Sequence, residues 1–428
     1  MDIEKGIKKA AKKIVGEDGT QYIKGIFYIA KHRGYLNSEN CMEIHTEYVE
    51  DVQVLELEKK HVFGGYYDVP LFSETDHRIL VHVIRQHAVT GKDAAEIGFF
   101  DYQENRFEKI TETLAWNWQQ GSRLRWSLED PSCIYVNKFD CGKYYCSKID
   151  ICSKEEKRRI PQALYDISRD EKIGITCDFV RLQKYRPGYG YSNITDPSEK
   201  VNVPSDSGVS AVDMNSGEER LLISLEKLAK SNDPEGKYIH YINHISISPS
   251  GEKVMFFHIF TYPKSANIYW KTQLCVIDVE GNNFHILEND ANVSHYTWIS
   301  DFRILITGIT RPDNTYFYRV YDVENGDYEE ISDSLLCQDG HPSMLGKEGW
   351  MVTDTYPDKS KFQHVIQYDM KNKIGMEIAS LFSDPRMSGE RRCDLHPKVS
   401  PSCKRIALDS TYTDKRRKVV ILKLKGSR

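Results

Sequence analysis

The feature that most constrains the fold of this 428-residue chain is an internal repeat. One pattern recurs six times: a mainly apolar pair, an aspartate, an apolar or aromatic residue, a polar turn and a second apolar segment. The copies are FFDYQENRFEKI, KIDICSKEEKRRI, AVDMNSGEERLLI, VIDVEGNNFHIL, VYDVENGDYEEI and QYDMKNKIGMEI. Each copy is typical of two strands joined by a tight turn in which Gly or Asn provides the reversal.

A second element precedes each aspartate copy and is also typical of strand, polar turn and strand. It has seven starts: VPLFSETDHRILV near Ser73, RLRWSLEDPSCIYV near Arg125, LYDISRDEKIGIT near Tyr165, and segments from His244, His295, His341 and His396. Together the two elements give four antiparallel strands every 40 to 50 residues or so, the period of propeller blades. The sequence therefore predicts an all-β, seven-bladed β-propeller over residues 49–428, with an insertion loop at about 186–207.

The last repeat lacks an outer strand, because the chain ends soon after KVVILKL. The alternating segment DVQVLELE (51–58) belongs to no repeat. We expect it to pair with KVVILKL and close the ring, which removes exposed sheet edges. Residues 1–48 form an extension that we expect to begin with an amphipathic helix carrying Lys8, Lys9, Lys12 and Lys13. The alternatives for that face are a solvated surface or an arm for nucleic acid or lipid.

Composition limits the classes of partner that we expect this protein to bind. The net charge of −5 gives no overall basic field for nucleic acid. No stretch approaches the 18 apolar residues that a membrane span needs. The N-terminus has no apolar segment of signal-peptide length, so we expect a cytoplasmic protein whose ten cysteines are reduced thiols.

Four histidines share one repeat position, at spacings of 51, 46 and 55 residues: His244, His295, His341 and His396. This position opens the innermost strand of a blade, which lines the central channel. We predict a divalent metal site there, zinc or manganese, because imidazole is a ligand for both. The alternative is a histidine kept by the repeat for packing or a turn hydrogen bond. Cys337 and Cys393 are further candidate ligands, or bystanders.

A second candidate site lies in the third repeat. The turn between Tyr165 and Arg181 falls near the middle, so we expect both to face one cleft. A cluster of cations and tyrosines follows, at Lys184, Arg186, Tyr189 and Tyr191. Arginine pairs with carboxylate in a fork and aromatic faces stack on sugar rings, which favours an acidic sugar as ligand. The alternative is a basic hairpin end with packing tyrosines.

Two neighbouring segments are candidates for the same rim. Asn117, Gln119 and Gln120 precede an inner strand and would offer neutral hydrogen-bonding groups to a substrate. His82 and His87 end the second strand of the first blade.

Cleavage of a uronate-containing glycan by β-elimination needs three groups: a cation for the carboxylate, a base for the C5 proton and an acid for the leaving oxygen. Arg181 or a metal serves as the cation. Tyr165 serves as base or acid, provided that Arg181 lowers its pKa. His82 or His87 completes the set.

The repeats, the His-Pro and Ser-Pro-Ser blade starts, and the Tyr165–Arg181 pair with RPGYGY resemble the seven-bladed polysaccharide lyases, which include oligogalacturonate and ulvan lyases. The resemblance covers roughly residues 50–428. It implies a catalytic metal on His244, His341 and His396, as in oligogalacturonate lyases. It also implies catalysis by Tyr165 and Arg181 beside a structural zinc, as in ulvan lyases. His295 lacks the flanking prolines, and Asn117, Gln119 and Gln120 stand where a catalytic histidine would be expected.

Three hypotheses follow for function. The first is a metal-containing lyase for acidic oligosaccharides or polysaccharides. The second is a non-catalytic propeller that binds a glycan or a protein. The third is a hydrolase or epimerase on the same sugars, for which paired carboxylates would be evidence. Asp354 and Asp409 occupy equivalent repeat positions, but their sequence context is typical of turns.

Overall fold

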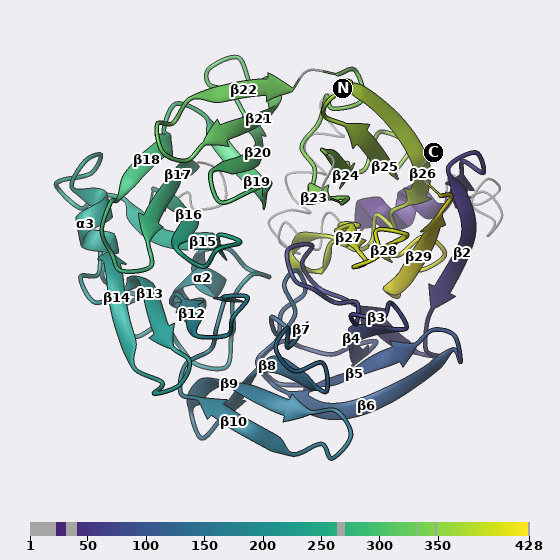
Figure 1. Cartoon of the computed structure of the whole chain (residues 1–428), viewed down its shortest axis with the longest axis horizontal. Helices are drawn as coiled ribbons and strands as arrows, with labels where there is room; N and C mark the ends of the chain where they lie inside the picture. The colour runs from purple at the N-terminus through teal and green to yellow at the C-terminus, as the bar shows by residue number, and fades with distance from the viewer. Residues whose placement is uncertain (1–22, 31–40, 263–269, 332, 347–348, 427–428) are drawn as a thin grey trace.

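The structure of the chain is a computed structural model that describes residues 23–30, 41–262, 270–331, 333–346 and 349–426. Seven antiparallel sheets are arranged in a ring around a central axis (Figure 1). The predicted seven-bladed β-propeller is confirmed. The lysines of the expected N-terminal helix, at positions 8, 9, 12 and 13, lie outside the described residues.

Each blade runs from an inner strand at the channel to an outer strand at the rim. Blades one to three are β3 (Lys60–Phe63), β4 (Arg78–Arg85), β5 (Ala95–Asp101) and β6 (Arg106–Thr113); β7 (Arg125–Trp126), β8 (Cys133–Asp140), β9 (Lys143–Asp150) and β10 (Glu156–Ile160); and β11 (Asp166–Ile167), β12 (Ile173–Thr176), β13 (Gly208–Asp213) and β14 (Glu219–Ser224). Blades four and five are β15 (Ile239–Ile247), β16 (Lys253–Thr261), β17 (Trp270–Asp278) and β18 (His285–Glu288); and β19 (Asn292–Trp298), β20 (Arg303–Ile309), β21 (Tyr316–Asp322) and β22 (Tyr328–Ile331).

The last two blades take strands from the N-terminal part of the chain. Blade six is β23 (Ser343–Met344), β24 (Trp350–Asp354), β25 (Phe362–Asp369) and β26 (Ile374–Phe382), with β1 (Met42–Ile44) as a fifth, outermost strand. Blade seven is β27 (Lys398–Val399), β28 (Arg405–Ser410) and β29 (Lys418–Leu424), and β2 (Val49–Leu55) completes it. The antiparallel pairing of β2 with β29 is the ring closure that the sequence predicts.

The helical segments of the described residues lie outside the sheets. They are α2 (Phe179–Tyr185), α3 (Leu225–Ala229), a 3-10 turn at Gly389–Arg391 and a helix formed by residues 23–30. The segment between β12 and β13, which holds α2 and the predicted insertion loop, is the longest connection inside a blade.

The repeated aspartate has a structural cause. In all six copies it is the last residue of the third strand of a blade. In five of them its Oδ1 accepts the backbone N–H groups two and three residues further on. An aspartate at this place closes the turn to the outer strand through its own side chain.

The first blade departs from the prediction. The start expected near Ser73 contributes only an isolated bridge, Phe72 to Ile79, and the inner strand proper is β3. A loop from Gly64 to Leu71 separates the two pieces. The repeat pattern missed this loop because no other blade contains a copy of it.

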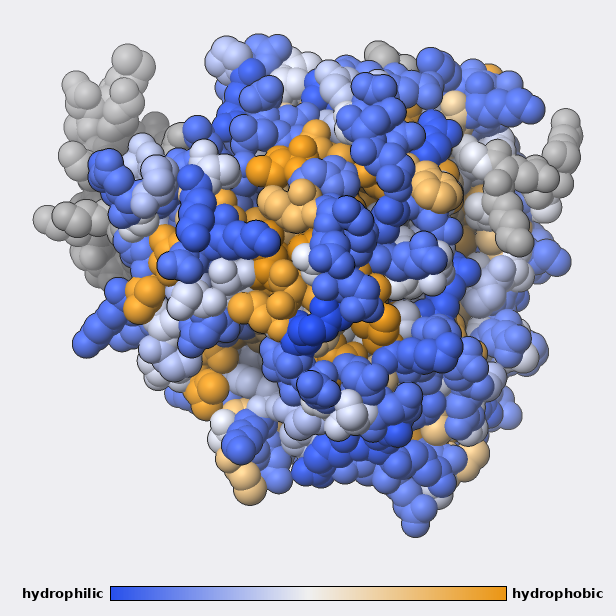
Figure 2. Space-filling model, turned by 60° about the vertical axis from the view of Figure 1, so that its left-hand side comes forward, coloured by the Kyte–Doolittle hydropathy of each residue, from blue (hydrophilic) through white to orange (hydrophobic). Residues whose placement is uncertain are grey.

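Apolar side chains fill the space between neighbouring blades in several clusters. Hydrophilic side chains cover most of the face shown in Figure 2, and apolar ones gather near its middle. No helix in the described part of the chain is long and apolar enough to cross a membrane.

Candidate functional site

The four histidines at one repeat position meet in the central channel. Their ring centroids are 5.7 Å apart between His244 and His295, 4.0 Å between His295 and His341, and 4.4 Å between His341 and His396. All four side chains are buried. The shared repeat position brings them together because each blade places it at the same height on the channel wall.

Local backbone geometry turns two of these histidines toward the axis. His244 and His396 have φ of +52° and +48°, in the left-handed region that residues other than glycine rarely adopt. In blade four the register of β15 against β16 shifts between Asn243 and Ser246, so that His244 lies on a bulge. Bulges of this kind redirect a side chain out of the ladder and are frequent beside functional sites.

Buried carboxylates orient two of the imidazoles. Asp354 Oδ1 lies 2.7 Å from His341 Nδ1, and Asp339 Oδ1 lies 3.1 Å from His295 Nδ1. An ionised carboxylate only accepts hydrogen bonds, so each Nδ1 carries a proton, and in the neutral imidazole Nε2 then keeps its lone pair. This is the arrangement that prepares histidine as a metal ligand.

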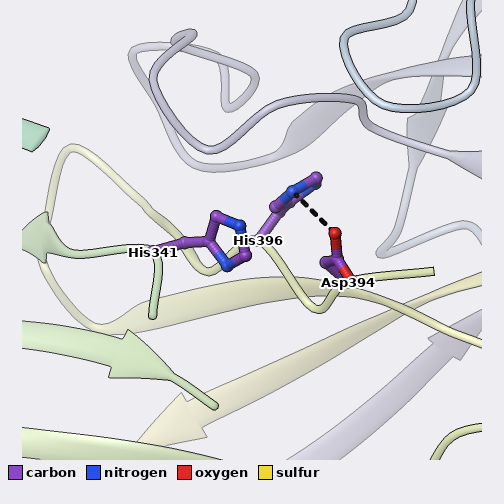
Figure 3. Close-up of side chains that lie close together, drawn as sticks. All are labelled: His341, Asp394 and His396. Atoms are coloured by element: carbon purple, nitrogen blue, oxygen red, sulfur yellow. Dashed lines mark ion pairs between the residues drawn. The ribbon is translucent and has the colours of Figure 1, made fainter. Parts of the chain in front are cut away.

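Three groups in the described chain lie close enough to share one metal ion: His341, Asp394 and His396 (Figure 3). One ligand atom from each falls within 4.8 Å of the others, and His396 Nε2 is 3.9 Å from Asp394 Oδ2. The Nε2 atoms of His341 and His396 are buried and have no hydrogen-bond partner among the described residues. Two imidazoles and a carboxylate suit zinc and also manganese. The third candidate ligand is therefore Asp394, and not the neighbouring Cys393 that the sequence had suggested.

Burial and charge act in opposite directions on the imidazoles. Burial lowers the pKa of His396 and His244 well below the ordinary value, and nearby cationic groups add to this. For His341, burial is again the largest single cause and lowers the pKa, but the charge and hydrogen bond of Asp354 together with the charges of Asp394 and Asp339 outweigh it, and the net shift is upward.

A tyrosine that the sequence analysis missed occupies the middle of the histidines. Tyr66 lies in the loop that interrupts the first blade, and its ring centroid is between 4.7 and 6.5 Å from those of all four histidines. Its hydroxyl is 3.3 Å from His244 Nε2. Asp409 fixes the loop by accepting the N–H groups of Gly64 and Gly65 at 2.7 and 3.2 Å. In the sequence, the Gly64–Gly65 pair was the one signal that could have indicated this loop.

The sequence context of Asp354 and Asp409 had indicated turn residues, but both lie in strands. Both are buried near the ends of strands, in β24 and β28. Because both oxygens of each carboxylate accept hydrogen bonds, these residues organise the channel rather than a turn.

Arg181 does not end a strand as predicted, and among the described residues its hydrogen bonds go to partners other than Tyr165. Arg181 lies in helix α2, which begins after Asp178, whose side chain caps two backbone N–H groups. Its guanidinium donates to the carbonyl oxygens of His240, Ser198 and Asn202, so it anchors the insertion. The helix replaces the expected strand because Asp178 is an effective N-cap ahead of an amphipathic segment.

Arg123 takes the place expected for Arg181. It lies over the Tyr165 ring at 4.3 Å and forms a two-pronged ion pair with Asp68 at 2.9 and 3.0 Å. The hydroxyl of Tyr165 is enclosed by Gln120, Asn243 and the backbone N–H of His244. Burial raises the pKa of Tyr165 well above its usual value although Arg123 opposes the change, so the expected lowering is also wrong.

The insertion does place part of the predicted cluster beside His244. Tyr189 is buried, with its ring centroid 5.9 Å from that of His244 and 6.1 Å from that of Tyr66. Arg186 lies 5.3 Å from the Tyr189 ring centroid, and Arg392 donates to the Tyr189 hydroxyl at 2.7 Å and to Asp394 at 2.9 Å.

Lys184 and Tyr191 lie elsewhere. Lys184 is exposed and pairs with Glu199 at 2.5 Å. Tyr191 is buried against Phe179, and its hydroxyl accepts a hydrogen bond from Asn137.

The remaining candidates have mainly internal contacts. The ring of His82 is fully buried, stacks on Phe63 and bonds Ser122, and its burial lowers the pKa to about 4, whereas His87 is exposed in the turn after β4. The His82 ring does contact the turn that holds Asn117, Gln119 and Gln120, through Ser122, whereas a role for His87 at the rim stays a prediction.

The three amides of the second blade lie in one tight turn and are buried. Asn117 Oδ1 accepts the N–H groups of Gln119 and Gln120. Gln119 donates to the carbonyl oxygens of Glu390 and Arg392, and Gln120 donates to Tyr165 at 2.6 Å. Of the three side chains, that of Gln120 contacts the predicted catalytic Tyr165.

The fold and site together define a seven-bladed β-propeller with a histidine-rich channel, and known structures share this fold. One is an oligogalacturonate lyase in complex with manganese, at 14% identity and a TM-score of 0.60, with 87% of this chain and 93% of that chain covered. Another is the oligogalacturonate lyase of Vibrio parahaemolyticus, also at 14% identity and 0.60, covering 89% and 96%. The sequence matches no family model and no curated protein. At this identity the likeness establishes the fold.

Proposed function

We propose that this protein is a carbon–oxygen lyase that cleaves uronate-containing oligosaccharides by β-elimination, with a divalent metal held by His341, Asp394 and His396. The observation that carries the proposal is the pair of buried, unpartnered Nε2 atoms beside Asp394. A buried polar atom without a partner costs free energy, so a ligand for it is expected. The manganese complex of a structurally similar lyase supports the choice of metal class, and zinc remains a candidate.

A bound divalent ion would supply positive charge to the uronate carboxylate, which acidifies the C5 proton. The remaining tasks fall to side chains of this chain. Arg186 and Arg392 both contact Tyr189, which packs on His244, and we assign them to hold an acidic sugar. They replace Arg181 of the original hypothesis, because Arg181 is engaged by the insertion.

Proton transfer is assigned to His244 and Tyr66. The Nδ1 atom of His244 is buried with no partner, and its Nε2 faces the Tyr66 hydroxyl. The lowered pKa keeps His244 neutral, so its unpartnered nitrogen can accept a proton, and the adjacent hydroxyl can deliver one to the leaving oxygen. Tyr165 is a weaker candidate because its hydroxyl is enclosed by three protein groups.

The test combines metal analysis with an activity assay. Purified protein should contain about one equivalent of zinc or manganese, and His341→Ala, Asp394→Asn and His396→Ala should lose it. The exposed His77 provides a matched control, His77→Ala, which should keep the metal. With metal bound, oligouronides should give the far-ultraviolet absorbance of an unsaturated product.

Two outcomes decide between the hypotheses. Metal binding without any unsaturated product across a panel of uronides, but with retained glycan affinity, would establish the non-catalytic binding propeller instead. Absence of metal in the wild-type protein, and no uptake on titration, would refute the proposed site. A cytoplasmic location stays a prediction.

A further inference from the structure

A cavity of about 320 Å³ adjoins the candidate metal group. Three parts of the chain line it: the helix of residues 23–30, the loop after β24 and the loop between β26 and β27. Asp394 and Arg392 of the candidate site form one wall. The cavity is at the lower end of the range of about 300–1,000 Å³ that is usual for ligand pockets, so it suits a small ligand.

The helix of residues 23–30 is the wall that comes from outside the propeller. In Figure 1 this purple helix lies by blades six and seven. The Tyr28 hydroxyl donates to the Ser360 carbonyl oxygen at 2.9 Å. Gly25 packs on the backbone of Pro385 and Arg386, and a Cβ atom at Gly25 would lie 2.5 Å from the Pro385 oxygen. Only a glycine allows the helix to approach this loop so closely.

The chemistry of the lining is cationic and aromatic. Lys24 and Lys361 contribute ammonium groups, and among the described residues neither forms an ion pair with a carboxylate. The two carboxylates of the lining are already compensated, Asp384 by Arg386 and Asp394 by Arg392.

Two tyrosines, Tyr28 and Tyr356, add aromatic surface to the same lining. The C–H face of a sugar ring packs against such surfaces, while an ammonium pairs with its carboxylate. The lining thus matches a ligand that has an apolar face and a negative charge.

We propose that this cavity is a subsite for a third acidic sugar residue, beyond the disaccharide unit at the metal group, and that the helix of residues 23–30 completes it. The inference rests on the proposed function for the identity of the sugar. The helix then acts as a determinant of chain length, because a disaccharide does not reach the cavity and a longer oligouronide gains affinity from it.

The experiment uses the full-length, metal-loaded protein and oligogalacturonides of two, three and four units. Binding is measured by calorimetry and cleavage by absorbance. Gly25→Ala should displace the helix, since the added Cβ meets backbone that cannot yield. Alanine also favours helix over glycine, so a loss cannot come from weakening the helix itself. Lys24→Ala provides a second variant that leaves the docking intact.

Both variants should weaken binding of the three- and four-unit ligands about tenfold, the loss expected for one charge-assisted contact, and leave the two-unit ligand unchanged. Ile26→Ala, on the exposed side of the same helix, should bind all three as the wild type does. Neutral oligosaccharides of the same lengths should not show the length dependence.

The outcomes separate this inference from the proposed function. Length-dependent binding that Gly25→Ala abolishes, without cleavage, would support the subsite and refute the lyase. Cleavage that is identical in wild type, Gly25→Ala and Lys24→Ala at every length would support the lyase and overturn the subsite. Equal losses for all three lengths, or no binding of any uronide, would also overturn it.

Discussion

Asp354→Asn tests whether the carboxylates of the channel prepare the histidines for metal. Asp354 accepts three hydrogen bonds: from Nδ1–H of His341 at 2.7 Å, from the His341 backbone N–H at 2.8 Å and from the His396 backbone N–H at 3.0 Å. The asparagine amide keeps one acceptor oxygen, and its NH₂ group must face one of these donors. The substitution therefore removes one charge-assisted bond and leaves buried donors unpaired.

The magnitude follows from those contacts. One lost bond to a charged group costs about 1.5–3 kcal/mol, and an unsatisfied buried donor adds about 1–3 kcal/mol. We expect the free energy of unfolding to fall by roughly 2.5–6 kcal/mol. Loss of such an orienting partner typically weakens metal affinity by about 10- to 100-fold. Urea denaturation of the metal-free protein measures the first quantity, and titration against a competing chelator measures the second.

Asp409→Asn is the matched control. Asp409 also accepts three hydrogen bonds, from the N–H groups of Gly64 and Gly65 and from the Lys398 ammonium, but none from a histidine. Its substitution should cost a similar free energy of unfolding with little change in metal affinity. Equal metal affinities for wild type and Asp354→Asn would refute the reasoning, and so would an equal loss of affinity in both variants.

Three further predictions follow. Arg181→Ala should lower the free energy of unfolding by about 3–5 kcal/mol through loss of the buried anchor, whereas Lys184→Ala on the exposed face should change it by less than about 0.5 kcal/mol; comparable urea midpoints would contradict this. Burial lowers the folded-state pKa of His82 from 6.5 to about 4. Between these two values the unfolded chain binds the extra proton, so the free energy of unfolding falls by about 3 kcal/mol as the pH drops from about 6.5 to 4. His82→Gln should flatten that slope in urea titrations at several pH values. Tyr66→Phe should keep the metal but lower kcat for uronide cleavage by about 100-fold, because the hydroxyl beside His244 is lost; an unchanged kcat would exclude Tyr66 from proton transfer.

The repeat predicted the ring and the meeting of the histidines because both depend on periodic position. A propeller places equivalent residues of successive blades side by side, so four histidines in register had to converge. Closure by residues 51–58 followed from counting strands, and the structure confirms it. Neither inference needed the geometry of any single side chain.

The errors arose where a segment has no copy in the repeat. Tyr66 lies in a loop found in one blade, and Arg181 lies in a helix inside the insertion. The helix was readable in principle, since Asp178 followed by FVRLQKY is an N-cap ahead of an amphipathic turn. The roles of Asp354 and Arg123 were not readable, because each depends on a partner from another part of the chain.

Strand β2 affects the candidate metal group as well as the sheet edge that it covers. His341 precedes blade six, and His396 precedes blade seven. Asp354, in blade six, accepts the His396 backbone N–H and thereby bridges the two blades. Blade seven has four strands only because β2 supplies one, and Leu55 at the end of β2 is fully buried. The geometry of the histidine pair is therefore coupled to ring closure: a shift of blade seven would separate the two ligands, and a metal bound between them would in turn stabilise the closed ring by binding only the folded state.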